Sequence, residues 1–474
     1  MNVRVQAVIA GLLAVCQLPA VFLALGLGEN PIPLLQSMLI CAGVALLYPL
    51  TRGAPGQLTA KDGILGVAIG WALTVQLGGL PYIFAGELGW IDATFETASG
   101  FTTTGSSVLT DIEVWPQSLL LWRSTTHYIG GMGILLLAIA ILPFLGVGGL
   151  QLMKAEVPGP TKDKLVPRVA STAQILWGLY FAITLACIAA YYFSGMTLLD
   201  AVNHAFATLA TGGFSTRNAS MGAFSPAAQW WSTFFMMAAG ANFMLHYRLL
   251  MKRDGSIWED DELRWYLAIF FAVGLFSAWV AYPVTAGQDV ELALRQGLFH
   301  VASIMTTTGF AATDWEKWPM YAQLVMLAIM IPGAMAGSTA GGIKIVRAVI
   351  MARIFSASVN RLLIPERVVL VKINRKPLSP EVIEGTVAMV SAAAAAVVIS
   401  TIFLVAWGMD VASAYSAALT AFCNVGPGIG SVGPMDNFSA VPDLGKLLLA
   451  FLMVLGRLEI FTLIILFLPR FWRE

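Results

Sequence analysis

The sequence predicts an all-α polytopic membrane protein, and three observations carry that prediction. Of the 474 residues, 58% are hydrophobic and only 11% are charged. An ordinary soluble domain has about 25% charged residues, so this chain cannot coat a soluble globule of its size. The apolar residues fall into ten long stretches, each near the 20 or so residues that cross a bilayer. Between these stretches, a Thr/Gly-rich cluster recurs four times.

The composition also indicates which ligands and partners the chain does not bind. The formal net charge is zero, so no overall positive field attracts polyanions, and we expect a lipid bilayer rather than nucleic acid around the chain. The four cysteines lie in apolar stretches without close pairing, which disfavours a disulfide framework or a zinc site. They are Cys16, Cys41, Cys187 and Cys423.

The ten apolar stretches are candidate helical spans, because a chain in lipid must satisfy its own backbone hydrogen bonds. They cover residues 5–28, 32–50, 64–85, 117–145, 170–193, 228–251, 265–285, 319–350, 383–407 and 445–468. The first two predict an N-terminal hairpin within 1–56, whose first span is too long for a cleavable signal. Of the 27 Lys and Arg, 20 fall on one side, four on the other and three within spans. The positive-inside rule therefore places both termini in the cytoplasm.

The Thr/Gly clusters occupy the same place in four successive units. Their aligned glycines are separated by 108, 96 and 117 residues. The clusters are Thr102-Thr103-Thr104-Gly105, Ala210-Thr211-Gly212-Gly213, Thr306-Thr307-Thr308-Gly309 and Cys423-Asn424-Val425-Gly426. Such a repeat predicts four parallel helix–pore-loop–helix units around a pseudo-fourfold pore. We place them at residues 57–150, 151–255, 256–365 and 366–474.

The chemistry of the clusters favours a cation selectivity filter. A short helix before each cluster would point its negative C-terminal end toward the axis, and Asp92 and Asp200 could cap two of these helices. Backbone carbonyls can replace the water around a cation where glycine allows positive φ, and threonine adds a hydroxyl oxygen. The predicted K⁺ ligands are Thr103, Thr104, Gly105, Thr211, Gly212, Gly213, Thr307, Thr308, Gly309, Asn424, Val425 and Gly426. One aligned glycine per repeat predicts a short filter with loose discrimination among alkali cations.

The alternative interpretation of each cluster is an ordinary turn between helices, but chance does not repeat a turn four times in the same topological position. A second feature is the glycine-rich break in the third repeat, which predicts a flexible loop under the filter that could act as a gate. Tight Gly/Ala helix packing is the alternative for this segment. The predicted gate residues are Gly333, Gly337, Ser338, Thr339, Gly341, Gly342, Lys344 and Arg457.

Arg457 lies in the last apolar span, where a charge must face the protein interior or water. It could be a positive barrier to cations, a tether for the gate loop, or a structural arginine paired with a carboxylate. The four histidines show no metal-ligand spacing, and we interpret them as structural. No H-E-x-x-H, G-x-S-x-G or Walker-type motif is present, so we expect no enzyme activity.

These motifs together resemble the Trk/Ktr/HKT potassium-transporter superfamily, and the hairpin at 5–50 is most similar to its bacterial TrkH-type membrane subunit. The resemblance implies a homodimer in the bacterial inner membrane, with a separate K⁺ pore in each protomer. It also implies a cytosolic, TrkA-like RCK regulatory subunit that binds the nucleotide, ATP/ADP or NAD, whereas this chain holds no cofactor. By match of motif, it assigns the four glycines to the filter, Gly333–Gly342 to the gating loop and Arg457 to the pore-lining arginine. Gly212, and the absence of a Thr run in the fourth repeat, distinguish this sequence from a fully symmetric filter.

The function predicted from these residues is a gated K⁺ uptake conduit. A membrane potential is worth about 2.3 kcal/mol per elementary charge per 100 mV, which is enough to drive K⁺ inward without chemical coupling. A K⁺ symporter coupled to H⁺ or Na⁺ on the same scaffold is the alternative. Carriers with two inverted repeats are disfavoured, because the four units here are parallel.

Overall fold

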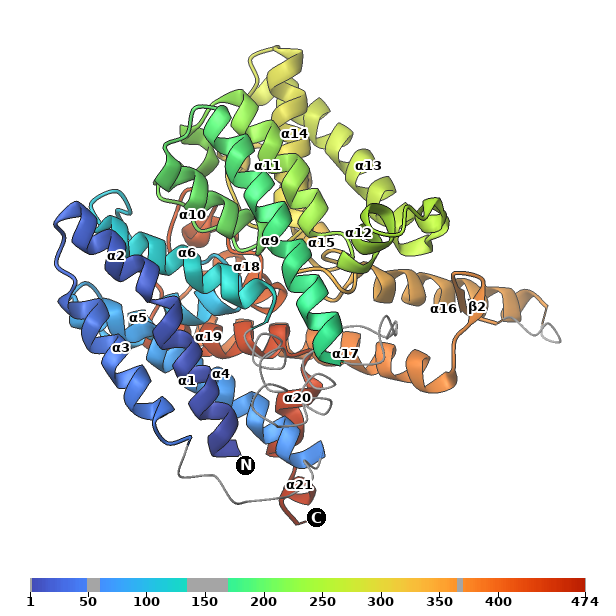
Figure 1. The fold of residues 1–474 in the computed structure, drawn as a ribbon. Helices are drawn as coiled ribbons and strands as arrows, with labels where there is room; N and C mark the ends of the chain where they lie inside the picture. Colours follow the sequence, from blue (N-terminus) through green and yellow to red (C-terminus); the bar gives the residue numbers. More distant parts are fainter. Residues whose placement is uncertain (1, 49–59, 134–168, 365–369, 474) are drawn as a thin grey trace.

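A computed structural model describes residues 2–48, 60–133, 169–364 and 370–473 of the chain. The described chain is almost entirely helical (Figure 1), as the composition predicts. Within it, five helices are long and apolar enough to cross a membrane, and a sixth crossing follows if the bent pair Asp443–Arg457 and Phe461–Phe467 counts as one span. The chain is a multi-pass membrane protein.

The N-terminal segment forms the expected hairpin beside the main body. Helices α1 (Asn2–Cys16) and α2 (Leu18–Leu27) run almost continuously, and α3 (Ile32–Ala45) returns along α1. Helix α2 ends at Gly28, whose left-handed φ of 71° suits a glycine. The carboxylate of Glu29 then accepts hydrogen bonds from the amides of Gln117 and Ser118, which ties the hairpin to the start of α6.

Four units of similar shape follow the hairpin, each with a long helix, a short helix and a second helix. The long helices are α4 (Ala60–Phe84), α9 (Val169–Phe193), α13 (Asp261–Val284) and α17 (Pro380–Ala406). The short helices are α5 (Trp90–Phe101), α10 (Leu198–Leu209), α14 (Val290–Met305) and α18 (Val411–Cys423). The second helices are α6 (Gln117–Gly131), α11 (Pro226–Ala239), α15 (Met320–Met330) and α19 (Asp443–Arg457).

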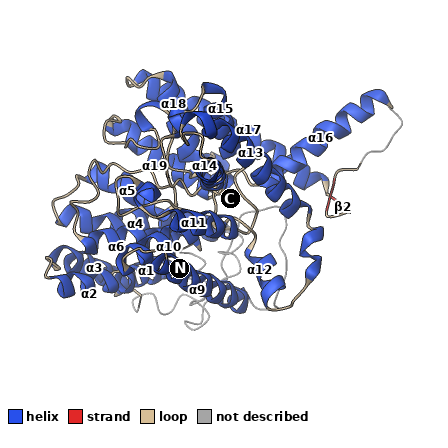
Figure 2. Ribbon diagram, turned by 90° about the horizontal axis from the view of Figure 1, so that it is seen from above, coloured by secondary structure: helices blue, strands red, loops and turns tan. Residues whose placement is uncertain are grey.

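The packing of these helices closes a ring. Each second helix contacts the short helix of its own unit and also the short helix of the next unit: α6 with α10, α11 with α14, α15 with α18, and α19 with α5. The last of these contacts joins the fourth unit back to the first. Figure 2 shows the helices of the four units packed side by side in one body. The ends of the short helices therefore converge on one place.

The second helices are interrupted rather than continuous. The break expected after α15 is present, and α16 (Ile345–Leu363) begins only beyond the glycine-rich loop. The prediction of unbroken spans over 228–251 and 445–468 is wrong. Helix α11 stops before α12 (Phe243–Leu250), and α19 bends by 113° into α20 (Phe461–Ile464). Helix α6 covers residues 117–131 of the predicted span 117–145, and residues 134–145 lie outside the described residues.

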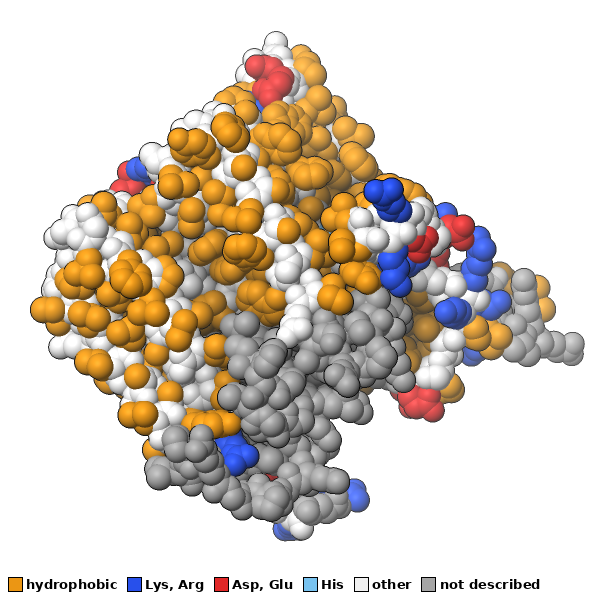
Figure 3. Space-filling model, in the orientation of Figure 1, with side chains coloured by type: hydrophobic (Ala, Val, Ile, Leu, Met, Phe, Trp, Pro, Cys, Tyr) orange, Lys and Arg blue, Asp and Glu red, His pale blue; other side chains and the backbone are white. Residues whose placement is uncertain are grey.

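Short 3₁₀ segments and one small hairpin complete the structure. The 3₁₀ segments are Ser220–Ala223, Gly255–Glu259, Trp315–Lys317, Gly430–Val432 and Ile465–Phe467, and α21 (Pro469–Arg473) ends the chain. Strands β1 (Lys372–Ile373) and β2 (Lys376–Pro377) pair antiparallel, with Lys372 opposite Pro377. Hydrophobic side chains cover much of the described surface in Figure 3, whereas Lys and Arg gather near α12, α16 and the β1–β2 hairpin.

Candidate functional site

The four glycine turns share one backbone conformation. The first residue of each turn lies in the left-handed region, with φ of 57° at Thr103, 54° at Thr211, 58° at Thr307 and 56° at Asn424. The glycine two residues later has φ of 84°, 77°, 81° and 106°, at Gly105, Gly213, Gly309 and Gly426. Threonine seldom adopts positive φ, whereas asparagine tolerates it. The same strained geometry occurs four times, so the surrounding structure imposes it.

The amides of these turns are tied back into the short helices. The amide of Thr104 donates to the carbonyl of Ser99 at 2.9 Å, and that of Thr308 donates to Ser303 at 2.8 Å. Gly212 and Val425 donate in the same way to Ala207 and Thr420. This pattern resembles the 6→1 bond of a helix C-cap. Since these bonds engage the amides, the carbonyls of the same residues are available for other contacts.

Those carbonyls form a closed ring, which we call the carbonyl ring. It consists of the backbone oxygens of Thr104, Gly212, Thr308 and Val425. A Cβ placed on Gly105 would collide with the Gly212 oxygen, one on Gly213 with the Thr308 oxygen, and one on Gly309 with the Val425 oxygen. A Cβ on Gly426 would lie 2.8 Å from the Thr104 oxygen, which closes the circle. Each glycine is therefore required by the next carbonyl as well as by its own φ.

The threonine hydroxyls beside the ring are turned away from it. The hydroxyls of Thr102 and Thr104 lie 2.8 Å apart, and those of Thr306 and Thr308 lie 2.7 Å apart. Thr102 and Thr306 in turn donate to carbonyls of their own helices. The side chain at this position therefore packs behind the turn, which explains how Gly212 and Val425 can replace threonine in the other two repeats.

The N-terminal ends of α5 and α10 differ from the sequence-based expectation. Asp92 and Asp200 lie in the first turns of α5 and α10, but the N-cap residues are Gly89 and Thr197. The Asp92 carboxylate instead meets Lys446 at 2.7 Å. Asp200 accepts hydrogen bonds from the side chains of Thr197, Thr216 and Arg217. Both carboxylates still lie at the positive ends of their helices, where the helix dipole favours them.

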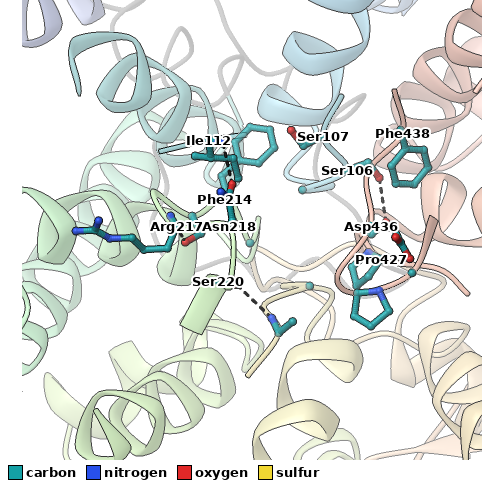
Figure 4. A pocket seen from close by; sticks show the side chains of 18 of the residues that line it. Ser106, Ser107, Ile112, Phe214, Arg217, Asn218, Ser220, Pro427, Asp436 and Phe438 are labelled. Carbon is teal, nitrogen blue, oxygen red and sulfur yellow. Dashed lines mark hydrogen bonds between the residues drawn. The ribbon is translucent and has the colours of Figure 1, made fainter. Parts of the chain in front are cut away.

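A pocket lies against the carbonyl ring, and Gly105, Gly213, Gly309 and Gly426 all line it. Figure 4 shows its polar wall, with Ser106, Asn218 and Asp436 around the opening. The Ser106 hydroxyl donates to the Gly426 carbonyl at 3.0 Å. Near this mouth, burial raises the pKa of Glu316, and the carboxylates of Asp314 and Asp436 raise it further.

The loop Gly333–Lys344, which joins α15 to α16, lies against the left-handed residues of the same turns. The Gly341 amide donates to the Thr307 hydroxyl at 2.7 Å, and a Cβ on Gly341 would lie 2.7 Å from the Asn424 Cβ. The hydroxyls of Thr339 and Thr211 are 3.4 Å apart. The loop therefore touches the left-handed residues of the second, third and fourth turns.

Arg457 occupies the remaining quadrant. Its guanidinium donates to the Thr339 carbonyl at 2.8 Å and to the Thr103 hydroxyl at 3.3 Å. It also donates to the carbonyls of Gly130 and Gly131, at 2.8 and 3.0 Å, which end α6. Helix C-terminal carbonyls lack intrahelical partners and carry negative charge, so they suit a cation. Of the roles considered from the sequence, tethering of the loop through carbonyls matches these contacts.

Hydrogen bonds also hold the loop to the interruption between α11 and α12. The amides of Met335 and Thr339 donate to Gly240 and Ala239, the carbonyls left open where α11 stops. The amide of Phe243, which begins α12, donates to the Gly337 carbonyl at 3.0 Å. Gly333 and Gly342 approach each other closely, with a Cβ on Gly342 only 3.0 Å from the Gly333 Cα. Ser338 bonds to Met335 within the loop.

Charged side chains hold both ends of this loop. One oxygen of Glu262 accepts the amides of Ala336 and Val346, at 2.7 and 3.2 Å. Lys344 is buried, adopts φ of 77° and bonds to the Ala340 carbonyl. Glu459 forms a bidentate ion pair with Arg347, with N–O distances of 2.9 and 2.6 Å.

Comparison with known proteins places the chain in a family. A family model described as a cation transport protein, TrkH, matches residues 35–474. The chain belongs to the TrkH family. The Trk system potassium uptake protein TrkH of Escherichia coli (strain K12) is 38% identical over 440 residues, covering 92% of this chain and 90% of that protein. The TrkH of Vibrio parahaemolyticus is 37% identical over 488 residues, covering 100% of this chain and 99% of that protein.

The fold agrees with that assignment. The crystal structure of the potassium transporter TrkH from Vibrio parahaemolyticus superimposes with a TM-score of 0.88 at 33% identity, covering 99% of each chain. The TrkH family is a family of transporters rather than enzymes. Among the described residues, no group of three or more His, Cys, Asp or Glu could hold a metal ion.

Sequence reasoning assigned no site role to several residues that this TrkH-family structure brings to the turns. Arg123 and His127 of α6 contact the segment after Gly213, and Glu262 holds the loop. A signal for Arg123 and Glu262 was present, since each is a charged residue within or beside an apolar stretch. His127 is polar but had no pattern that linked it to a turn 85 residues away.

Proposed function

We propose that this chain is the K⁺-conducting subunit of a potassium uptake system, and that K⁺ passes inward through the carbonyl ring. The closed ring carries the proposal. Four backbone oxygens meet around one axis, and the negative ends of four short helices converge there. Such a site offers oxygen ligands to a cation that has lost its shell of water. The similar proteins are named a potassium uptake protein and a potassium transporter, which agrees with this ion.

In this proposal the ligands are backbone carbonyls rather than threonine hydroxyls. The hydroxyls of Thr104 and Thr308 are engaged behind the turns. A single ring-forming carbonyl before each glycine supports the expectation of a short filter with loose discrimination. The lack of threonine at Gly212 and Val425 then leaves the quadrants equivalent where the ion binds.

The loop Gly333–Lys344 is the proposed gate. In the proposed orientation the loop lies on the cytoplasmic side of the carbonyl ring. It contacts three of the four turns, and Arg457 contacts the first turn. In this position the loop and the guanidinium together obstruct the inward path. Opening requires the loop to leave Thr307, Thr211 and Arg457.

We place the protein in the bacterial inner membrane with both termini in the cytoplasm. The two termini lie at the same end of the molecule in Figure 1, and the basic loops on one side support this orientation. The exposed basic residues Lys252, Arg253 and Arg375 would then offer a docking face for a cytosolic RCK-type regulatory subunit that carries the nucleotide.

We further propose a homodimer through the second half of α16, which projects from the body in Figures 1 and 2. Leu362 and Leu363 are 83% and 75% exposed there. Cysteine cross-linking tests this in membranes: Leu362→Cys should form a covalent dimer. Phe193→Cys, on the equally exposed α9 surface, should not. Cross-linking of both variants or of neither would count against this interface.

Ion flux in proteoliposomes tests the transport proposal. Vesicles with an imposed negative interior should take up K⁺ and Rb⁺ in preference to Na⁺ and Li⁺. Gly309→Ser should change that preference, because any side chain there meets the Val425 oxygen. Gly178→Ser is the matched control, since nothing lies within 4 Å of a Cβ at Gly178. Unchanged preference in Gly309→Ser would refute the assignment of the ring.

The same vesicles separate the conduit from the symport alternative. A conduit takes up K⁺ under voltage alone, at a rate independent of the pH or Na⁺ gradient. Uptake that requires an inward H⁺ or Na⁺ gradient even at a favourable voltage would establish coupled transport on this scaffold.

A further inference from the structure

Helix α6 of the first repeat reaches across to the turn of the second. Arg123 and His127 are four residues apart, so they lie on one face of α6. Both are buried, at 2% and 0% exposed. They face Phe214 and Ser215, the two residues that follow Gly213. Two side chains of one repeat therefore contact the turn of another.

His127 bridges two repeats through both ring nitrogens. Its Nδ1 lies 2.7 Å from the Gly100 carbonyl, which can only accept, so Nδ1 carries the proton. Its Nε2 accepts the Phe214 amide at 3.2 Å, and the two rings stack with centroids 3.9 Å apart. These bonds fix the orientation of the imidazole.

The fixed imidazole explains why the second turn has Gly212 where the other turns have threonine or valine. A Cβ on Gly212 would lie 2.5 Å from Cδ2 of His127. The second turn therefore has two successive glycines, Gly212 and Gly213, and its backbone has the most conformational freedom of the four. A turn of this kind needs support from outside to hold its carbonyl in the ring.

Arg123 adds a second support on the same segment. Its Nη1 donates to the Ser215 carbonyl at 3.1 Å, and its Cζ lies 3.4 Å from the centre of the Phe214 ring. Its Nε pairs with Glu96 at 2.6 Å. Glu96 in turn accepts the Val108 amide at 2.9 Å, just after the first turn. One chain of bonds thus joins the first and second turns.

The corresponding positions of the other repeats bond within their own unit. Nine residues before the ring glycine stand Glu96, His204, His300 and Ala417. His204 bonds to the Ser215 hydroxyl, and His300 meets the Ala312 and Thr313 amides. In the fourth repeat, the neighbouring Ser416 bonds to Ile429. These hydrogen bonds each stay inside one repeat, as does the bond from Val108 to Glu96, whereas the bonds of Arg123 and His127 to Ser215 and Phe214 cross between repeats.

We propose that His127, supported by the Arg123–Glu96 pair, is a positioning and specificity-determining residue that holds the Gly212 carbonyl in the carbonyl ring. This inference rests on the proposed function of the ring as a K⁺ filter. Without the imidazole, the double-glycine turn moves, the ring widens or becomes irregular, and a smaller or more hydrated cation is rejected less well.

The test is a double-mutant cycle on the K⁺ to Na⁺ flux ratio in proteoliposomes. His127→Ala should lower the ratio by about twofold to tenfold, the range for the loss of one hydrogen bond. Gly212→Ala should lower K⁺ flux by more than tenfold because of the collision. The double variant should recover most of that flux, because removing the imidazole makes room for the methyl group. No recovery, together with a normal ratio in His127→Ala, would overturn the proposal.

Arg123→Gln has a matched control in Arg295→Gln. Arg295 is also buried in an ion pair, with Glu291, and it bonds to Gln229 rather than to a turn. Arg123→Gln should lower the ratio, and Arg295→Gln should leave it unchanged. Equal effects of both would mean that any buried arginine matters, which contradicts a specific support.

Amide hydrogen exchange tests whether His127 holds the second turn, and it does not depend on ion transport. The segment holding the Phe214 amide should exchange faster in His127→Ala, while the segment holding Phe310 should not change. If the wild-type protein passes no K⁺, the proposed function fails, and the exchange rates still decide whether His127 holds the turn. Unchanged exchange at Phe214 would refute the support itself.

Discussion

Removal of the Arg457 guanidinium should increase K⁺ flux. The guanidinium donates a hydrogen bond to the loop Gly333–Lys344, at the Thr339 carbonyl, over 2.8 Å. A hydrogen bond to a charged group is worth about 1.5–3 kcal/mol. Loss of that bond should shift the balance between seated and displaced loop by about 10- to 150-fold. Loss of the positive charge beside the path acts in the same direction.

Two substitutions separate the tether from the charge, with initial K⁺ uptake in proteoliposomes as the assay. Arg457→Ala removes both, whereas Arg457→Lys keeps the charge but loses the planar fork that reaches Thr339, Gly130 and Gly131 together. If tethering dominates, both variants raise the flux, and Arg457→Ala raises it most. Arg248→Ala is the control, since Arg248 pairs with Asp254, away from the loop. A folded Arg457→Ala protein with wild-type flux would refute the reasoning.

Three further predictions concern the loop and the hairpin. Gly341→Ala should raise K⁺ flux several-fold, because the new Cβ overlaps Asn424 and displaces the loop; unchanged flux would place the obstruction elsewhere. Glu262→Ala leaves two amides without their acceptor, so it should cost about 1–3 kcal/mol of stability, lower the melting temperature and raise the flux. A lower melting temperature with normal flux would show that Glu262 supports the fold but not the gate. Glu29→Ala should cost about 0.5–2 kcal/mol through the lost cap of α6 and leave K⁺ flux unchanged, and altered flux would mean that the hairpin acts on the path.

The turns were predictable because their cause is local. Glycine at Gly105, Gly213, Gly309 and Gly426 marks a backbone with positive φ, and a fourfold recurrence in one topological position signals a shared axis. The glycine run from Gly333 likewise predicts a helix break. In both cases the sequence pattern reports the backbone conformation directly.

The other breaks were not predictable, because their cause is tertiary. Residues 234–241 carry no polar side chain, and the helix stops where the loop Gly333–Lys344 donates to the carbonyls of Ala239 and Gly240. The bend after Arg457 puts Glu459 and Ile460 at positive φ, although neither is a glycine, and the nearby Gly456 lies inside α19 rather than at the bend. At this bend Glu459 forms an ion pair with Arg347, which is 112 residues away in the sequence. Hydropathy cannot detect either contact.

The partners of the helix-end carboxylates and the contact of His127 with the second turn were also not predictable from the sequence. Asp92 and Asp200 stand in the first turns as expected, but Lys446 and Arg217, distant in sequence, determine where their carboxylates point. The missing threonine at Gly212 was visible in the sequence as an irregularity. Its reason, the imidazole of His127, is a contact between two repeats that only the folded chain shows.

The most direct test of the account is diffraction from crystals grown with Tl⁺ or Rb⁺ in place of K⁺. The account predicts an anomalous peak on the axis of the carbonyl ring, bounded by the oxygens of Thr104, Gly212, Thr308 and Val425. Ordered ions elsewhere in the protein, with no density among these four oxygens, would contradict it.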